Sequence, residues 1–203
     1  MAVCKKNLMK TIFEKLSAPF QKIGANGQKI STHKWKVQTT KGGVAMCVAY
    51  IDARQVAERL NTVLGIDSWS DSLIETNGEG IICEISANID GKTVVHSNVG
   101  TPSDYQKIKG QASDAFKRAA TKFGVGAYLY EMEAVRLKIA VVNGKKYPST
   151  SDGKALINGN DLTSYINTFH PLRLKLTEIW DAIPKNKQKN YSEIFTKIWE
   201  DLK

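Results

Sequence analysis

Hydrophobic and polar residues follow two different periods in the first part of the chain. Residues 34–38 and 44–51 are short runs rich in apolar residues, and the Lys-Gly-Gly sequence between them is typical of a turn joining two strands. Asp52, with Gln55 three residues later, has the spacing of a helix capping box. Apolar residues then recur at helical spacing as far as Gly65. This pattern predicts an amphipathic helix that begins after Asp52 and ends at Gly65.

Three further strands are predicted at residues 69–76, 81–89 and 92–99. An Asp-Gly sequence separates the second from the third, and both residue types tolerate the positive φ angles of a two-residue hairpin turn. Alternate apolar residues of the middle strand share one face. We therefore predict that Cys83, on that face, is a packed core thiol rather than a nucleophile.

The stretch from residue 104 to residue 130 predicts one long helix with two unlike sides, which Gly124 ends. The apolar side comprises Tyr105, Ile108, Ala112, Ala115, Phe116, Ala119, Ala120 and Phe123. The opposite side comprises Lys107, Gln111, Lys117, Arg118, Thr121 and Lys122. The small alanines favour close packing against a sheet. The periodicity does not decide whether the bases bind a polyanion or only face solvent.

The last third of the sequence has a different character. Residues 134–142 and 145–148 predict a hairpin through Asn143-Gly144. Helical spacing then predicts three helices broken by Pro171 and Pro184, at residues 161–169, 172–183 and 185–202. The large apolar residues of the last helix fit either packing on the core or contact with another subunit or a partner. We predict two domains, a core at 1–150 and a helical C-terminal segment at 151–203.

Charge is segregated along the 203 residues, whose formal net charge is +9. Residues 1–41 contain nine lysines and Glu14, which gives +8. Residues 42–103 contain three bases and eight acids, which gives −5, and residues 104–130 contain five bases and two acids, which gives +3. Such a distribution favours a polyanionic partner.

Other classes of function have little support in the sequence. No apolar run approaches the ~20 residues of a membrane span, so no membrane partner is expected, and residues 1–16 fit an ordinary first helix. Cys4, Cys47 and Cys83 have neither zinc nor disulfide spacing, which favours a reduced, cytoplasmic setting. The histidines are isolated, and no phosphate-binding loop or hydrolase motif occurs. We therefore expect no enzymatic activity, no metal and no cofactor.

Two separated motifs carry a family resemblance. The first is AYIDAR at 49–54, followed by RLN at 59–61, Gly65 and Trp69, and the second is SDAFKRAA at 113–120, followed by KFG at 122–124 and YLY at 128–130. In this order they closely resemble the Rad-fifty-two (Rad52) family of single-strand annealing recombinases, and the phage and prophage members most. The resemblance covers roughly residues 20–135.

The resemblance implies an α+β fold, with a curved antiparallel sheet packed on a long basic helix. It also implies a homo-oligomer in the form of a ring or helical arc, which binds single-stranded DNA without nucleotide hydrolysis. The expected function is ATP-independent annealing of complementary strands in homologous recombination and double-strand break repair. The second possibility is a single-stranded DNA-coating replication accessory protein that does not anneal, and the third is a nuclease or other enzyme acting on DNA.

The resemblance also implies a set of DNA-binding residues. Lys117 and Arg118 match the bases of the family that contact the DNA backbone, and Arg54 matches a base at the start of the first core helix. Lys107, Lys109 and Lys122, on the same long helix as the pair, complete the candidate site. A phage or prophage protein would act in the bacterial cytoplasm. The candidate helper proteins are a single-strand-binding protein and an exonuclease.

Overall fold

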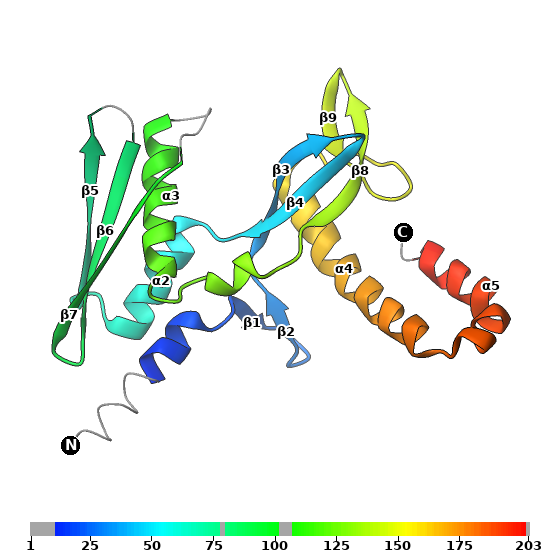
Figure 1. Cartoon of the computed structure of the whole chain (residues 1–203), viewed down its shortest axis with the longest axis horizontal. Coiled ribbons are helices and arrows are strands. Elements are labelled where there is room, and N and C mark those ends of the chain that lie inside the picture. The colour runs from blue at the N-terminus through cyan, green and yellow to red at the C-terminus, as the bar shows by residue number, and fades with distance from the viewer. Residues whose placement is uncertain (1–10, 78–79, 102–106, 202–203) are drawn as a thin grey trace. The chain divides into compact units, whose positions relative to one another are not determined.

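A computed structural model describes residues 11–77, 80–101 and 107–201 as an α+β structure with antiparallel sheets, which confirms the expected fold class (Figure 1). Cys4 and Tyr105 lie outside the described residues, and only the backbone of Lys107 and His170 is described. The chain forms two compact units. Unit 1 comprises residues up to Thr32 together with Ile51–Glu131, and unit 2 comprises His33–Tyr50 together with the residues from Met132 onward.

Unit 1 contains a three-stranded antiparallel sheet in the order β5-β6-β7. Its strands are β5 (Trp69–Thr76), β6 (Gly80–Ile89) and β7 (Lys92–Val99), in close agreement with the prediction. Asp90 and Gly91 have φ angles of 53° and 73° in the turn between β6 and β7. The Asp-Gly sequence therefore forms the predicted hairpin, because both residues accept the left-handed conformation.

The long helix α3 (Lys107–Thr121) packs on β6 and β7. Cys83 is fully buried between them, and burial raises the pKa of its thiol to about 11, as expected for a core residue. Ala115 and Ala119 are also fully buried, so small side chains let the helix approach the sheet. The approach is closest at Gly100, where an added Cβ would overlap the carbonyl oxygen of Gln111. Ile108 departs from the predicted pattern, since it is 68% exposed.

The second helix, α2 (Ala53–Leu64), begins and ends as predicted. The Asp52 side chain accepts the amide of Gln55, the Gln55 side chain accepts the amide of Asp52, and Gly65 is the C-cap. Arg59 on this helix donates from Nη1 to three carbonyls at the end of a helical segment at residues 11–17, namely those of Lys15, Leu16 and Ala18. Arg59 thus joins α2 to the start of the chain. Unit 1 is completed by the short strands β1 (Gln21–Ile23) and β2 (Lys29–Ser31) and by the 3-10 turn η1 (Ala127–Tyr130).

Unit 2 contains a four-stranded antiparallel sheet in the order β3-β4-β8-β9, covered on one face by α4 (Gly159–Ala182). The strands are β3 (Lys34–Lys41), β4 (Val44–Tyr50), β8 (Val135–Val142) and β9 (Lys145–Pro148). Trp35 anchors the helix, because its backbone amide donates to Thr163 Oγ1 over 3.0 Å and its ring Nε1 donates to Asn167 Oδ1 over 2.9 Å. The core of this unit therefore combines distant parts of the sequence.

The C-terminal helices differ from the prediction at one proline. We predicted a break at Pro171, and this was wrong, because α4 runs through that residue without interruption. Proline removes one amide donor but already has a helical φ angle, and the turns on either side keep their bonds. The break at Pro184 is confirmed, since α5 (Lys185–Asp201) begins immediately after it.

The compact units do not follow a division at residue 150. Leu137 on β8 lies before that position and Leu162 on α4 lies after it, yet both belong to one buried cluster. The division into a functional core at 1–150 and a helical segment at 151–203 stays a prediction. No helix within the described ranges is long and apolar enough to cross a membrane.

Candidate nucleic-acid interface

The bases predicted on the long helix lie on or next to its polar side. Lys109 is exposed in the first turns of α3, and Lys117 and Arg118 are partly exposed farther along the helix. Lys122 is exposed immediately after the last residue of α3. The helix therefore presents cations at both ends of its length.

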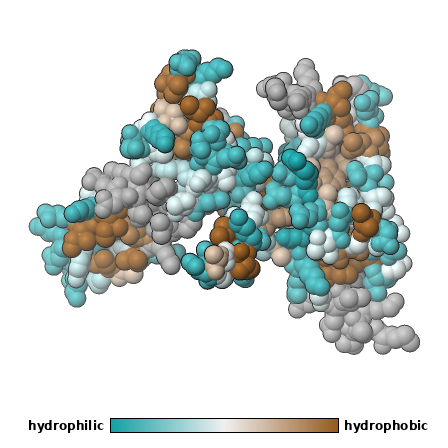
Figure 2. Space-filling view, turned by 180° about the vertical axis from the view of Figure 1, so that it is seen from behind, coloured by the Kyte–Doolittle hydropathy of each residue, from teal (hydrophilic) through white to brown (hydrophobic). Residues whose placement is uncertain are grey.

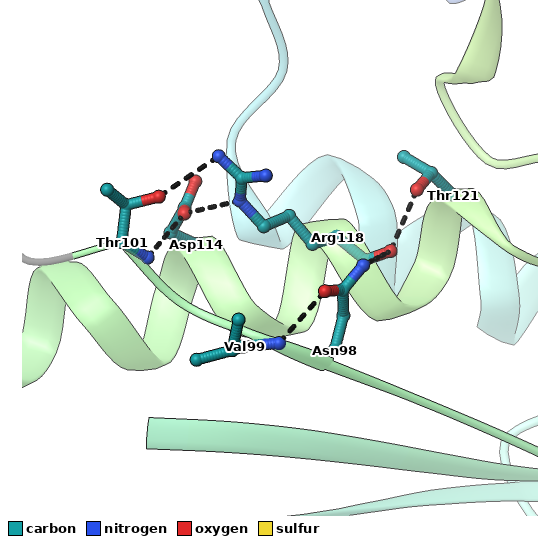
Figure 3. A network of polar contacts seen from close by, with 6 residues as sticks. All are labelled: Asn98, Val99, Thr101, Asp114, Arg118 and Thr121. Carbon is teal, nitrogen blue, oxygen red and sulfur yellow. Dashed lines mark hydrogen bonds and ion pairs between the residues drawn. The ribbon is translucent and has the colours of Figure 1, made fainter. Parts of the chain in front are cut away.

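Arg118 is held by neighbouring side chains (Figure 3). Its Nε donates to Asp114 Oδ2 over 2.7 Å, and its Nη2 donates to Thr101 Oγ1 over 3.0 Å. The Thr101 amide donates to the same Asp114 oxygen over 2.9 Å. The guanidinium thus joins the segment after β7 to α3, while its Nη1 has no hydrogen-bond partner among the described residues.

Both members of this ion pair are charged at neutral pH. Burial alone would raise the pKa of Asp114, but the hydrogen bonds from the Thr101 amide and the Arg118 guanidinium outweigh it and hold the pKa below its ordinary value. The hydrogen bond to Asp114 in turn raises the pKa of Arg118. The side chain of Arg118 is 41% exposed and that of Asp114 is 30% exposed, so solvent largely screens the attraction between them.

Lys122 is also bonded to the rest of unit 1. Its Nζ donates to the backbone carbonyl of Ser97 over 2.6 Å, on β7. Asn98 of the same strand donates from Nδ2 to the carbonyl of Arg118 over 3.4 Å, and Thr121 Oγ1 donates to that carbonyl over 2.7 Å (Figure 3). These contacts fix the end of α3 against an edge strand. Lys122 and Arg118 therefore have structural partners as well as exposed surface.

Arg54 lies elsewhere, in the first turn of α2, where it is exposed. The neighbouring Gln55 is occupied by the helix cap and also donates from Nε2 to the carbonyl of Thr32. Across the described part of the chain, no polar contact joins Arg54 to Arg118 or Lys122. The structure thus brings the α3 bases together and leaves Arg54 as a separate cation.

A second basic surface, on the sheet of unit 2, was missed in the sequence analysis. Strands β3, β4, β8 and β9 contain no acidic residue. Their bases are Lys34, Lys36, Lys41, Arg136, Lys138, Lys145 and Lys146. The signal was present in the sequence, because the pairs Lys34/Lys36 and Arg136/Lys138 have the two-residue period that places side chains on one face of a strand.

The register of the strands places six of these bases on one face. Lys36 lies opposite Val48, Arg136 opposite Met46, and Lys138 opposite Val44. Directly opposed residues share a face of the sheet. The bases of this sheet face, which is the one away from α4, are Lys34, Lys36, Lys41, Arg136, Lys138 and Lys145. The other face carries the fully buried Ala45 and Cys47.

Two partly exposed tyrosines lie among these bases. Tyr50 lies opposite Lys34, and the Lys36 Nζ is 5.6 Å from the centroid of the Tyr50 ring. Tyr147 lies opposite Ala140, on the same face. Lysines and arginines interspersed with aromatic rings on a sheet are typical of surfaces that bind single-stranded nucleic acids. The basic side chains hold the phosphates, and the aromatic rings stack on the nucleobases.

Other chemistry has no comparable site in the described residues. No group of three or more histidine, cysteine or acidic side chains that could hold a metal occurs there. Cys47 is buried, and burial raises the pKa of its thiol to about 11. His33 is also buried, which lowers the pKa of its imidazole.

Comparison with known proteins shows the family of this chain. Two relatives are named single-stranded DNA-binding protein DdrA, from Deinococcus deserti and Deinococcus radiodurans, and are 34% and 32% identical to this chain over 90 residues. The matched stretch covers 43% of this chain, and 44% and 42% of the respective relatives, so this chain spans less than half of their length. Residues 9–147, more than half of the chain, match the Rad52/22 family double-strand break repair protein. The chain therefore belongs to the Rad52/22 family of double-strand break repair proteins.

Proposed function

We propose that this protein binds single-stranded DNA and anneals complementary strands, without ATP, in recombination and double-strand break repair. The observation that carries the proposal is the family match over residues 9–147, which includes α3 and, except for Pro148 at the end of β9, the four strands of the second basic surface. The names of the two DdrA relatives support single-stranded DNA as the ligand. The proposed role needs no catalytic group, no metal and no cofactor.

The α3 bases suit contact with a DNA backbone. They are fixed to a helix that packs on a sheet, so their positions lose little freedom when a phosphate binds. Cations on a rigid helix attract phosphates regardless of sequence, and counterion release makes such binding sensitive to salt. We assign the phosphate contacts of unit 1 to Lys109, Lys117, Arg118 and Lys122, with Lys107 and Arg54 as further candidates.

The basic sheet face of unit 2 suits a second stretch of the same ligand. Arg136 and Lys138 are exposed, and Val48 and Met46 lie between the rows of bases. A face of this kind holds the backbone electrostatically and offers apolar contact to nucleobases. We assign single-stranded DNA to this face as well.

Annealing also requires many DNA-binding surfaces in one assembly, and we propose a homo-oligomer of ring or arc form. Strand β5 offers a surface for it, because it is an edge strand whose Asp71, Leu73 and Glu75 are exposed. Unprotected edge strands readily pair or pack with another chain. The proposal extends to a phage or prophage protein acting in the bacterial cytoplasm, with a single-strand-binding protein or an exonuclease as helper.

One observation favours the second candidate function, which is coating of single strands without annealing. The rings of Tyr50 and Tyr147 are partly exposed on the basic sheet face. Stacking of nucleobases on such rings is worth about 1–3 kcal/mol per base and would withdraw those bases from pairing.

The two functions are separated by the rate at which labelled complementary oligonucleotides pair. With neither ATP nor metal present, an annealing protein increases that rate above the rate of the free strands. A coating protein binds the same strands tightly and delays their pairing. Absence of binding to single strands in a fluorescence titration would contradict both functions.

A further inference from the structure

The two C-terminal helices form a defined hairpin in unit 2. Gln188 on α5 donates from Nε2 to the carbonyls of Trp180 and Ile183, each over 3.1 Å, at the end of α4. The rings of Trp180 and Phe195 pack with their centroids 4.3 Å apart. Helix α5 is therefore held against the end of α4 in a set orientation.

Only part of the apolar surface of α5 is used in this contact. Tyr191, Ile194 and Ile198 are 49%, 60% and 41% exposed. Their spacing of three and then four residues places them in one stripe along the helix. Figure 2 shows hydrophobic surface at its left, over α4 and α5. Three large apolar side chains in a row on a helix surface indicate a contact surface.

The order of charges along α5 is the second observation. Lys185, Lys187 and Lys189 lie in its first five residues, whereas Glu193, Glu200 and Asp201 lie in the remainder with Lys197 as the one base. A helix has a partial positive charge at its N-terminus and a partial negative charge at its C-terminus. This order of charges therefore opposes the dipole of α5 and does not stabilise the helix alone.

A second copy of α5 in antiparallel orientation would complement both features. Antiparallel pairing brings the basic beginning of each helix against the acidic end of the other. Positions 187, 191, 194, 198 and 201 alternate in spacing of four and three residues, as at the seam between two packed helices. Ile194 lies at the middle of this series, so a two-fold axis there relates position 187 of one copy to position 201 of the other.

We propose that α5 pairs antiparallel with α5 of a second copy of this chain, burying the stripe of Tyr191, Ile194 and Ile198. Three apolar side chains per copy make a small interface, and such interfaces are weak between single chains. Many copies in one assembly strengthen a weak contact through effective concentration. If the protein forms the proposed oligomer, the pairing links one assembly to another.

Cysteine cross-linking in the full-length chain tests the pairing and its direction. A Cys4→Ser background leaves only the buried Cys47 and Cys83 as native thiols. In this background we expect Ile194→Cys to form an intermolecular disulfide under mild oxidation. A mixture of Tyr191→Cys and Ile198→Cys chains should also cross-link, whereas Tyr191→Cys alone should not. Ile157→Cys, which is exposed outside both helices, is the control and should stay uncross-linked.

A charge exchange tests the electrostatic part. Changing Lys185, Lys187 and Lys189 to Glu, together with Glu193, Glu200 and Asp201 to Lys, should preserve cross-linking among exchanged chains. It should abolish cross-linking between exchanged and original chains, because like charges would then meet at both ends.

Three outcomes would overturn the pairing. Cross-linking of Tyr191→Cys with itself would indicate a parallel pair. Absence of any cross-link at position 194, in a chain whose circular dichroism is unchanged, would assign the stripe to another part of this chain or to a different protein. Cross-linking that is insensitive to the charge exchange would remove the electrostatic argument. Annealing by an Ile194→Asp variant is measured separately, so failure of the pairing leaves the proposed function to be decided by its own assay.

Discussion

The Nε atom of Arg118 lies 2.7 Å from Oδ2 of Asp114, and the same carboxylate oxygen accepts the amide of Thr101 from the segment after β7. One carboxylate therefore orients a proposed DNA contact and also fixes the entry to α3. Its effect on folding and its effect on DNA binding can be measured separately, because folding is followed without DNA.

Replacement of Asp114 by Ala should destabilise the protein. The Thr101 amide and the Arg118 guanidinium lose a charged acceptor, and a hydrogen bond to a charged group contributes about 1.5–3 kcal/mol, reduced here because the pair is partly exposed. We expect the free energy of unfolding in urea to fall by about 1 kcal/mol. Glu131→Ala, at the exposed C-cap of η1 in the same unit, is the matched control and should leave it unchanged. Equal stability of the two variants would contradict the role given to Asp114.

The contribution of Asp114 should depend on pH. Its pKa in the folded protein is below the ordinary value, so the stabilisation is complete above the ordinary carboxyl pKa of about 3.9 and is lost as the pH falls through the folded pKa. The difference in unfolding free energy between the original chain and Asp114→Asn should therefore be constant near neutral pH and shrink in acid. A difference that grows in acid would have the wrong sign.

Lys117→Ala should weaken binding of single-stranded DNA on every sequence alike. Loss of one phosphate contact reduces the slope of log affinity against log salt by about 0.7 for a single strand. Thr101→Val removes the hydrogen bond from Arg118 to the Thr101 hydroxyl and leaves the charge of Arg118 unchanged. This variant therefore tests whether DNA binding depends on the orientation of the Arg118 guanidinium. An unchanged slope in a folded Lys117→Ala variant would place this base among the solvated cations of the surface.

The basic sheet face of unit 2 gives an independent prediction. Lys36→Ala combined with Lys138→Ala should reduce the salt slope by about 1.4, for two lost phosphate contacts. Lys154→Ala, exposed in the loop after β9, is the control with the same type of charge removed outside this face. Affinity that falls equally in the control and in the double variant would assign the effect to net charge alone.

Local signals in the sequence predicted much of this fold. The capping box at Asp52 and the Asp-Gly turn at 90–91 each depend on residues close together in the sequence, and both are confirmed. The alternation in β6 predicted the burial of Cys83 for the same reason. Such features follow from backbone preferences and from the side-chain period of one element.

Features that depend on distant residues were not predictable in the same way. The contact of Lys122 with Ser97 requires the packing of α3 beside β7, which no periodicity reveals. The basic sheet face of unit 2 requires the pairing of β4 with β8, which lie before and after residues 51–131 of unit 1 in the sequence. The sequence has helical periodicity on both sides of Pro171, but the usual helix-breaking effect of proline led to the prediction of two helices where there is one.

The pairing of Cys47 with Val135 has a consequence for the order of folding. Residues 48–134 separate these partners, so the sheet of unit 2 closes a long loop, which has a higher entropic cost than a hairpin. Within unit 1 the side chain of Ile51 lies next to Gly126, which brings the two ends of that loop together once unit 1 has folded. During synthesis the hairpin of β3 and β4 emerges early, with one edge of β4 unpaired until β8 is made. That interval is when the nascent chain is most exposed to pairing with a foreign strand.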